Sequence, residues 1–261
     1  MYKDADMVYD NYIKRQPTVT YAIIGDVHSQ GRPLASALAH CKEHNLTPIL
    51  LGDLFDSRCT VSETLCVYDL ARRAEREMGA IILNSNHQER LIEATAGTLE
   101  RAEYCKETFR TLEELQESDL DPGEITDWLR GLPDGFVFRD STDHEYCCAH
   151  AYFPITLRDS SRTGPYTVFA VSDEEREKMV WGPMNSDGRR YHWWRRISDK
   201  QSFTRVAGHY HKVLINDQCL ILDANAGYEE GSVLLYEVES KTPVYFDATG
   251  ATIKQELSSV A

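Results

Sequence analysis

The stretch TYAIIGDVH (residues 20–28) holds the pattern that decides the fold. Its β-branched, apolar run predicts a buried strand, and the Gly-Asp that follows predicts a turn. The pattern returns in TPILLGDLFD (residues 47–56), and AIILNSNH (residues 80–87) gives a third strand with a polar end. Helical patterns fill both intervals, and Gly79 is expected to end the second helix in a left-handed conformation. Strands and helices that alternate at these lengths predict βαβ units and a parallel sheet.

The rest of the chain changes character along its length. Residues 90–130 are predicted to form a charged helical insert, and strand-like runs after residue 134 are predicted to form a second sheet or extend the first. Residues 151–202 are rich in Gly, Pro, Arg and aromatic residues, which predicts an irregular insert acting as a lid or a substrate-binding segment. No linker divides the sequence, so residues 1–261 are expected to form a single domain.

Composition and charge exclude several classes of protein. The chain has 261 residues, 42% of them hydrophobic, and a formal net charge of −14. This charge argues against broad, non-specific binding to nucleic acid or to an anionic membrane. Residues 1–17 lack a continuous apolar run, so no signal peptide is expected, and no stretch reaches the roughly 18 apolar residues of a membrane span. Seven cysteines without a CxxC pair are typical of reduced thiols, so a cytoplasmic protein is expected.

Metal-binding or proton-transferring side chains follow the strands at five places. They are Asp26 and His28, Asp53 and Asp56, Asn86 and His87, His150, and His209 and His211. Ligands bind at the carboxyl ends of strands in open α/β sheets, so these residues are expected to converge on one edge. The H-x-H spacing is expected to lie in a strand, where both rings point to one face. Each motif alone fits a turn or a buried histidine, but their joint order favours a metal site.

The mixture of side chains indicates which metals would bind. Carboxylates, imidazoles and an amide oxygen suit manganese, iron or zinc better than calcium or magnesium. One shared carboxylate can bridge two ions about 3.5–4 Å apart, a separation that clamps both sides of a phosphoryl displacement. The expected cofactors are therefore two divalent metal ions, with manganese as the first choice and iron or zinc as alternatives.

These five blocks resemble a known family. GDVH, GDLFD, SNH, CAH and GHYH, in this order between residues 25 and 211, resemble the calcineurin-like metallophosphoesterase superfamily, whose pattern is GDxH, GDxxD, GNH[DE], a single His and GHxH. Further on, RVAGHYH…LILDANAG…GSVLLYEV is similar to the phosphoprotein phosphatase branch, which includes protein Ser/Thr phosphatases and symmetric diadenosine tetraphosphatases. The resemblance implies an α/β fold, a four-layer αββα sandwich in which helices flank two mixed β-sheets.

The resemblance also implies a role for each matched residue. The metal ligands would be Asp26, His28 and His211 for one ion, Asn86, His150 and His209 for the other, and Asp53 bridging both. His87 would protonate the leaving oxygen with Asp56 as its supporting carboxylate, while metal-bound hydroxide attacks phosphorus. The implied function is phosphate ester hydrolysis, with a phosphoprotein, another phosphomonoester, a nucleotide or a dinucleoside polyphosphate as the phosphorylated substrate.

Some positions depart from the family pattern. Ser57 stands where the phosphatase branch has a phosphate-binding arginine, and Arg58 is the candidate to replace it. Ser85 replaces the Gly before the asparagine, and Gln88 replaces the usual acid, which leaves Glu89 to compensate. Arginine forks match phosphate oxygens well. The other candidate phosphate-binding residues are Arg90, Arg158, Arg189, Arg190, Arg195 and Arg196.

Several interpretations stay open at this point. In GRRYHWWRR (residues 188–196), the aromatic side chains could stack a nucleobase or could pack the insert. The missing arginine also fits a phosphodiesterase that acts on cyclic nucleotides or RNA ends. A different class is a non-catalytic scaffold that keeps the fold and binds partner proteins. The presence of every matched ligand and of His87 favours an enzyme.

Overall fold

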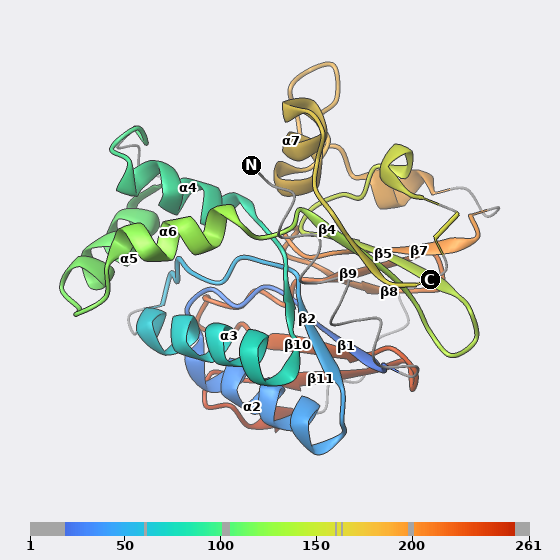
Figure 1. Cartoon of the computed structure of the whole chain (residues 1–261), viewed down its shortest axis with the longest axis horizontal. Helices are drawn as coiled ribbons and strands as arrows, with labels where there is room; N and C mark the ends of the chain where they lie inside the picture. Colours follow the sequence, from blue (N-terminus) through green and yellow to red (C-terminus); the bar gives the residue numbers. More distant parts are fainter. Residues whose placement is uncertain are drawn as a thin grey trace.

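The computed structural model describes residues 19–59, 62–100, 105–159, 161–162, 164–197 and 201–253, so the expectation of no signal peptide in residues 1–17 lies outside this part. Two six-stranded mixed β-sheets pack face to face, and helices lie against their outer faces (Figure 1). The predicted α/β fold of two mixed sheets flanked by helices is confirmed. None of the helices in the described residues is long and apolar enough to cross a membrane.

Sheet A joins strands from both ends of the sequence in the order β12-β11-β10-β1-β2-β3. Its parallel half consists of β1 (Tyr21–Ile24), β2 (Thr47–Leu50) and β3 (Ile81–Ile82). Its antiparallel half consists of β10 (Val233–Glu237), β11 (Thr242–Phe246) and β12 (Thr252–Ile253). The predicted βαβ units thus form half of the sheet, and β10 pairs with the free edge of β1.

Two helices cover the outer face of sheet A, α2 (Gly31–Glu43) and α3 (Thr64–Met78). Leu34 of α2 belongs to one buried cluster with Ile24 and Leu50 of the sheet. The predicted end of α3 is confirmed, because Gly79 adopts a left-handed conformation with φ 67°. Burial of these apolar faces fixes both helices on the sheet.

Sheet B has the order β6-β4-β5-β7-β9-β8. Its strands are β4 (Gly135–Arg139), β5 (Glu145–Ala149), β6 (Tyr166–Val168), β7 (Phe203–Ala207), β8 (Val213–Ile215) and β9 (Cys219–Leu222). Side chains alternate along a strand, so Ile23 and Ile49 point away from the helices. They share a buried cluster with Phe136, Phe138 and Leu220 of sheet B, which forms the interior of the sandwich.

In the described residues, the predicted helical insert contains the last part of α4 (Asn86–Thr95) and all of α5 (Lys106–Gln116) and α6 (Pro122–Arg130). These three helices gather at one end of the molecule (Figure 1). Residues 151–197 are more regular than their composition predicted. They contain β6, α7 (Asp173–Trp181) and two short 3₁₀ helices, η2 (Ile155–Leu157) and η3 (Trp193–Arg196).

This second segment covers the outer face of sheet B. Met179 of α7 is fully buried in a cluster with Val137, Cys147 and Phe153, so the segment adds a layer to the sandwich. All seven cysteines lie in the described residues, and each is a free thiol.

Candidate metal centre

Five strand ends from both sheets bring polar side chains together. The residues are Asp26 after β1, Asp53 after β2, Asn86 after β3, His150 after β5 and His209 after β7. All five are more than nine-tenths buried. Side chains of this kind are rarely buried without partners that satisfy them. The predicted convergence of these five residues therefore creates a polar centre inside the molecule.

His150 lies in the middle of this centre. Its Nε2 atom is 2.9 Å from Asn86 Oδ1, 3.1 Å from His209 Nδ1 and 3.3 Å from Asp53 Oδ1. Its Nδ1 atom lies 3.0 Å from the Leu51 carbonyl oxygen, so Nδ1 carries the proton and donates it there. The Nε2 atom consequently presents a lone pair to three electronegative atoms.

The atoms around His150 fit a shared cation. If His209 Nδ1 carries a proton, it can satisfy only some of the contacts around His150 Nε2. Asn86 Oδ1 and the Asp53 carboxylate oxygen are acceptors and have no proton to donate. Two imidazole nitrogens, an amide oxygen and a carboxylate oxygen form a donor set that suits manganese, iron or zinc.

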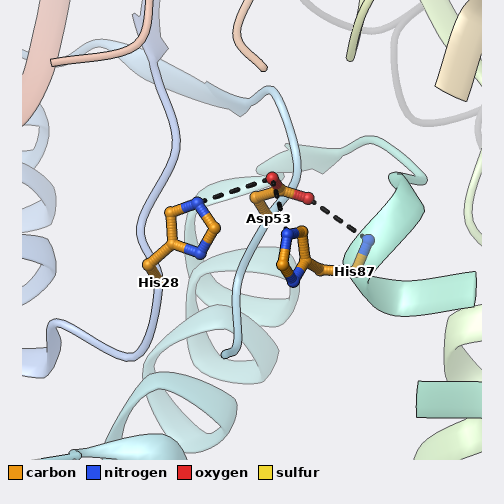
Figure 2. Close-up of side chains that lie close together, drawn as sticks. All are labelled: His28, Asp53 and His87. Carbon is orange, nitrogen blue, oxygen red and sulfur yellow. Dashed lines mark hydrogen bonds and ion pairs between the residues drawn. The ribbon is translucent and has the colours of Figure 1, made fainter. Parts of the chain in front are cut away.

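Asp53 faces a second group of side chains through its other oxygen. His28 Nε2 lies 3.5 Å from Asp53 Oδ2 and 4.0 Å from Asp26 Oδ2. His28 Nδ1 is 3.1 Å from the Phe55 carbonyl oxygen, which leaves the lone pair on Nε2. Figure 2 shows His28 and His87 directed at Asp53 from two sides. A carboxylate that uses each oxygen toward a different group has the arrangement that a bridging ligand needs.

Asp26 lies near the carboxylate of Asp223, a residue that the five sequence motifs do not contain. The backbone N–H of His209 donates to Asp26 Oδ2 at 2.9 Å. Burial raises the pKa of Asp26 well above its ordinary value, and the nearby carboxylates of Asp223 and Asp53 raise it further. A divalent cation would relieve this repulsion and favour the ionised form.

His211 lies at the rim of the centre. The expectation that His209 and His211 share a strand face is wrong, because β7 ends at Ala207 and both histidines have left-handed backbones, with φ 67° and 48°. The side chain of His211 is 46% exposed, and its Nδ1 atom lies 3.6 Å from Asp223 Oδ2. Its ring contacts Tyr228 edge-on. The turn therefore separates the two histidines.

His87 and Asp56 form a hydrogen-bonded pair next to Asp53. His87 Nδ1 lies 2.8 Å from Asp56 Oδ2, and His87 Nε2 lies 3.8 Å from Asp53 Oδ2. The hydroxyls of Thr108 and Thr111, both on α5, donate to the same Asp56 carboxylate. Burial lowers the pKa of His87, but Asp53 and Asp56 together raise it above its ordinary value.

Histidines also set the charge of the central carboxylate. Burial raises the pKa of Asp53, yet His150 and His87 outweigh it and bring the pKa well below its ordinary value. Burial lowers the pKa of His209 far below its ordinary value, and His150 and Arg190 lower it further. Asp53 is thus ionised and His209 neutral, which are the protonation states that metal ligands require.

The backbone is strained around the centre. The non-glycine residues with left-handed backbones include His28, Asp53, Asp56, His209 and His211. Such conformations cost about 1–3 kcal/mol each and persist where the surroundings impose them, often at functional sites. Glycine permits the closest approaches: a Cβ on Gly208 would lie 1.9 Å from Asp26 Oδ1, and one on Gly227 would lie 2.5 Å from His28 Cβ.

The structure accommodates the departures from the family pattern around α4. Ser85 has an extended backbone, φ −151°, and its hydroxyl caps α4 by accepting from the Gln88 N–H. Gln88 is buried and donates to the Leu83 carbonyl oxygen. Glu89 accepts a hydrogen bond from Trp181 Nε1 at 3.0 Å and pairs with Arg176 at 2.8 Å. Glu89 therefore connects α4 to α7.

Arg58 lies against Tyr228, which contacts His211. Its guanidinium stands 5.0 Å from the centre of the Tyr228 ring and 3.7 Å from Glu107 Oε1. The side chain is 56% exposed. Ser57, which occupies the position of the family arginine, is buried and accepts from the Cys59 N–H. Arg58 is thus near the rim residues His211 and Tyr228.

Two other arginines interact electrostatically with the centre. The charge of Arg90 lowers the pKa of His87, and the charge of Arg190 lowers that of His209. Arg158 instead forms a salt bridge with the buried Glu145 on sheet B. The four candidates of the second insert, Arg189, Arg190, Arg195 and Arg196, are exposed.

The aromatic residues of the second insert mainly pack against one another. Trp193 is buried, and its Nε1–H lies 3.1 Å from both the Ala151 carbonyl oxygen and the Tyr210 hydroxyl. Trp194 stacks on His192 and meets Tyr210 edge-on. These contacts favour packing over nucleobase stacking for both tryptophans.

Three residues of the centre were missed by motif reasoning. Asp223 follows the apolar strand CLIL, so its position at a strand end is the same signal that indicated the other candidate ligands. Thr108 and Thr111 carry no such signal, because nothing in a helical segment indicates which distant carboxylate its hydroxyls will meet.

Comparison with known proteins adds information on the fold. No family model matches the chain, and no curated protein matches it. It is similar to a hypothetical protein from Pyrococcus horikoshii OT3, with a TM-score of 0.52, 11% identity and coverage of 88% of each chain. It is also similar to a cold-active protein-tyrosine phosphatase of a psychrophilic Shewanella species, with a TM-score of 0.51 and 17% identity over 90% of this chain and 80% of that chain. At these identities the likeness shows the fold alone.

Proposed function

We propose that this protein is a metal-dependent phosphoesterase. The observation that carries the proposal is the arrangement around Asp53, whose two oxygens face His150 on one side and His28 on the other. A proton-donating pair, His87 and Asp56, adjoins the same carboxylate. The Shewanella protein of the same fold is described as a protein-tyrosine phosphatase, which supports phosphate ester hydrolysis.

The donor set supports two metal positions that share Asp53. One position would be held by Asp26 and His28, and the other by Asn86, His150 and His209. His211 was expected to be the third ligand of the first position, together with Asp26 and His28. It lies beside Asp223, on the same side of the centre as Asp26. When bound, two divalent ions would supply an activated water and positive charge next to the phosphate.

His87 would supply the proton for the leaving oxygen. Its Nδ1 is fixed by Asp56, so its Nε2 faces the centre on the side of Asp53. Asp53 and Asp56 raise its pKa, and this increases the protonated fraction near neutral pH. A positioned acid of this kind contributes about 10²–10⁴-fold to the rate.

Arginine side chains would orient the phosphate. Arg58 stands at the rim beside Tyr228, and Arg90 and Arg190 are further candidates because their charges lower the pKa values of His87 and His209. Guanidinium groups bind phosphate oxygens through paired N–H donors. Since both tryptophans of the second insert are engaged in packing, we favour a phosphomonoester substrate, such as a phosphoprotein, over a substrate whose base must be stacked. Cyclic nucleotides and RNA ends remain the alternative substrates.

The test is turnover of model substrates by metal-free protein supplied with manganese, zinc or no metal. Wild type is expected to hydrolyse p-nitrophenyl phosphate faster than bis-p-nitrophenyl phosphate, and only with metal. Asp53→Asn should lower kcat/KM by at least about 100-fold, because the shared carboxylate is lost. His144→Asn, which changes a histidine bonded to Thr204 in sheet B, serves as the control.

Each alternative gives a different result in this assay. Faster hydrolysis of the diester would replace the monoesterase proposal with the phosphodiesterase one. Absence of metal-dependent turnover on both substrates would contradict the enzyme and support the non-catalytic scaffold. Equal activity of Asp53→Asn and wild type would remove Asp53 from the reaction.

A further inference from the structure

A second group of metal-binding side chains meets on the outer face of sheet A. The group consists of His40 in α2, His44 directly after α2, and Glu237 at the end of β10. One ligand atom of each side chain lies within 4.8 Å of those of the other two. His40 Nε2 is 2.7 Å from Glu237 Oε1, and the two imidazole rings stack with centroids 4.3 Å apart.

The secondary structure explains why these three side chains lie close together. Residues four apart on a helix share a face, so the rings of His40 and His44 lie next to each other. Side chains alternate along a strand, so Glu237 points to the same face as Val233 and Leu235, which share a buried cluster with Leu34 of α2. Figure 1 shows α2 beside β10 and β11, and the three elements are in contact.

The group is separate from the candidate metal centre. Glu237 pairs with Ala22 near the start of β1, whereas Asp26 follows the end of that strand. His40 and Glu237 are partly buried and His44 is exposed, so solvent reaches the group from one side. Metal binding at this group would therefore be independent of the proposed function.

We propose that His40, His44 and Glu237 bind one divalent transition-metal ion of the zinc class. Two imidazole nitrogens and one carboxylate oxygen, with a position left for water, are a common zinc ligand set. Donors about 2.1 Å from a tetrahedral ion are about 3.4 Å apart, so only small side-chain shifts are needed. Ser240 Oγ donates to Glu237 Oε2 at 2.6 Å, which orients the carboxylate and leaves Oε1 toward His40.

An ion pair between His40 and Glu237 alone would not need the second imidazole. The ring of His44 nevertheless stacks on that of His40, and a ligand atom of His44 lies within 4.8 Å of those of His40 and Glu237. A bound ion would use all three groups and would join α2 to the central strand β10.

Zinc binding to metal-free protein tests the proposal. The number of zinc equivalents retained against a chromophoric chelator is compared between wild type, His44→Ala, Glu237→Gln and the control His192→Ala, which removes another exposed histidine. The candidate metal centre is unchanged in all four proteins, so a difference in the number of bound zinc ions reports on the site of His40, His44 and Glu237 alone. Wild type and the control should bind one equivalent more than His44→Ala, and Glu237→Gln should bind that equivalent about tenfold or more weakly.

Thermal unfolding gives a second measurement of the same site. Zinc should raise the melting temperature of wild type more than that of His44→Ala or Glu237→Gln, because the ion stabilises the folded state to which it binds. Equal melting temperatures without zinc establish that the variants fold; if His44→Ala melts lower, Glu237→Gln carries the comparison. An unchanged zinc count in both variants, or an equal loss in His192→Ala, overturns the proposal.

Discussion

His87 lies next to a proposed ligand but has a different proposed role, and this makes it the most informative single residue. We expect His87→Asn to lower kcat by about 10²–10⁴-fold, because the proton donor is removed. Metal content should stay that of wild type, because the proposed role of His87, paired with Asp56, is proton donation and not metal binding. Steady-state kinetics and metal analysis of the same preparation measure both quantities. A loss of metal in parallel with activity would show instead that His87 is a ligand.

Thr108 and Thr111 should affect the reaction without touching the substrate. Both donate to the Asp56 carboxylate, which in turn orients His87. We expect Thr111→Val to lower kcat by about tenfold, in keeping with the loss of one hydrogen bond to a charged group. The loss should be larger for a substrate with a poor leaving group, which depends more on the proton donor.

A matched control distinguishes this effect from general destabilisation. Thr126→Val removes a similar buried hydroxyl, which donates to the Gly123 carbonyl oxygen within α6. Equal losses of kcat in the Thr111 and Thr126 variants, or the same loss for good and poor leaving groups, would contradict the positioning role.

At the level of the element, the turn between β4 and β5 links stability to pH. Asp140 Oδ1 accepts from the backbone N–H groups of Thr142 and His144, each at 2.9 Å. Burial raises the pKa of Asp140, but the hydrogen bond from the Thr142 hydroxyl and these two backbone hydrogen bonds lower it below its ordinary value. The folded state therefore favours the ionised carboxylate. Its contribution is complete above the unfolded pKa of about 4 and is lost as pH falls through the lower folded pKa.

We expect Asp140→Ala to lower the free energy of unfolding by about 1 kcal/mol at neutral pH. The difference from wild type should shrink as pH falls below about 4, because wild type then loses the ionised form of Asp140. Urea unfolding at several pH values measures it, with Asp187→Ala, an exposed aspartate, as the control. A difference that stays constant as Asp140 becomes protonated would show that its ionised form does not contribute to stability.

Strands that carry a clear local sequence pattern could be predicted from the sequence. Contacts between residues far apart in the sequence could not. β1 and β2 have β-branched runs that end in Gly-Asp, so their residues and their parallel pairing follow from local pattern. The residues ending these strands could be placed at one edge for the same reason. The left-handed turn at His209 and His211 depends on the tight contact between Gly208 and Asp26, which no local pattern reveals. The second insert gained regular structure because sheet B offered an edge to β6.

At the level of the whole molecule, the candidate metal centre connects the two sheets. Asp53 and Asn86 follow strands of sheet A, whereas His150 and His209 follow strands of sheet B. An ion bound to all four would hold the sheets together and relieve the repulsion among buried carboxylates.

Removal of metal should therefore destabilise the protein. A ligand present at 100 times its Kd stabilises the folded state by about 2.7 kcal/mol. For a chain of this size we expect a chelator to lower the melting temperature by about 5–10 °C. Calorimetry with and without manganese measures the change, and Asp53→Asn should show a much smaller one. The same melting temperature with and without manganese would show that the centre binds no metal at this concentration.

The position of β10 in sheet A has a consequence for biosynthesis. β1 leaves the ribosome early, but the strand that pairs with one of its edges is β10, which is made only after all of sheet B. Until then, that edge of β1 offers unpaired backbone N–H and C=O groups to other chains. Translation that stops before residue 233 would thus release a product prone to aggregation, and the nascent protein would depend on chaperones until its last strands emerge.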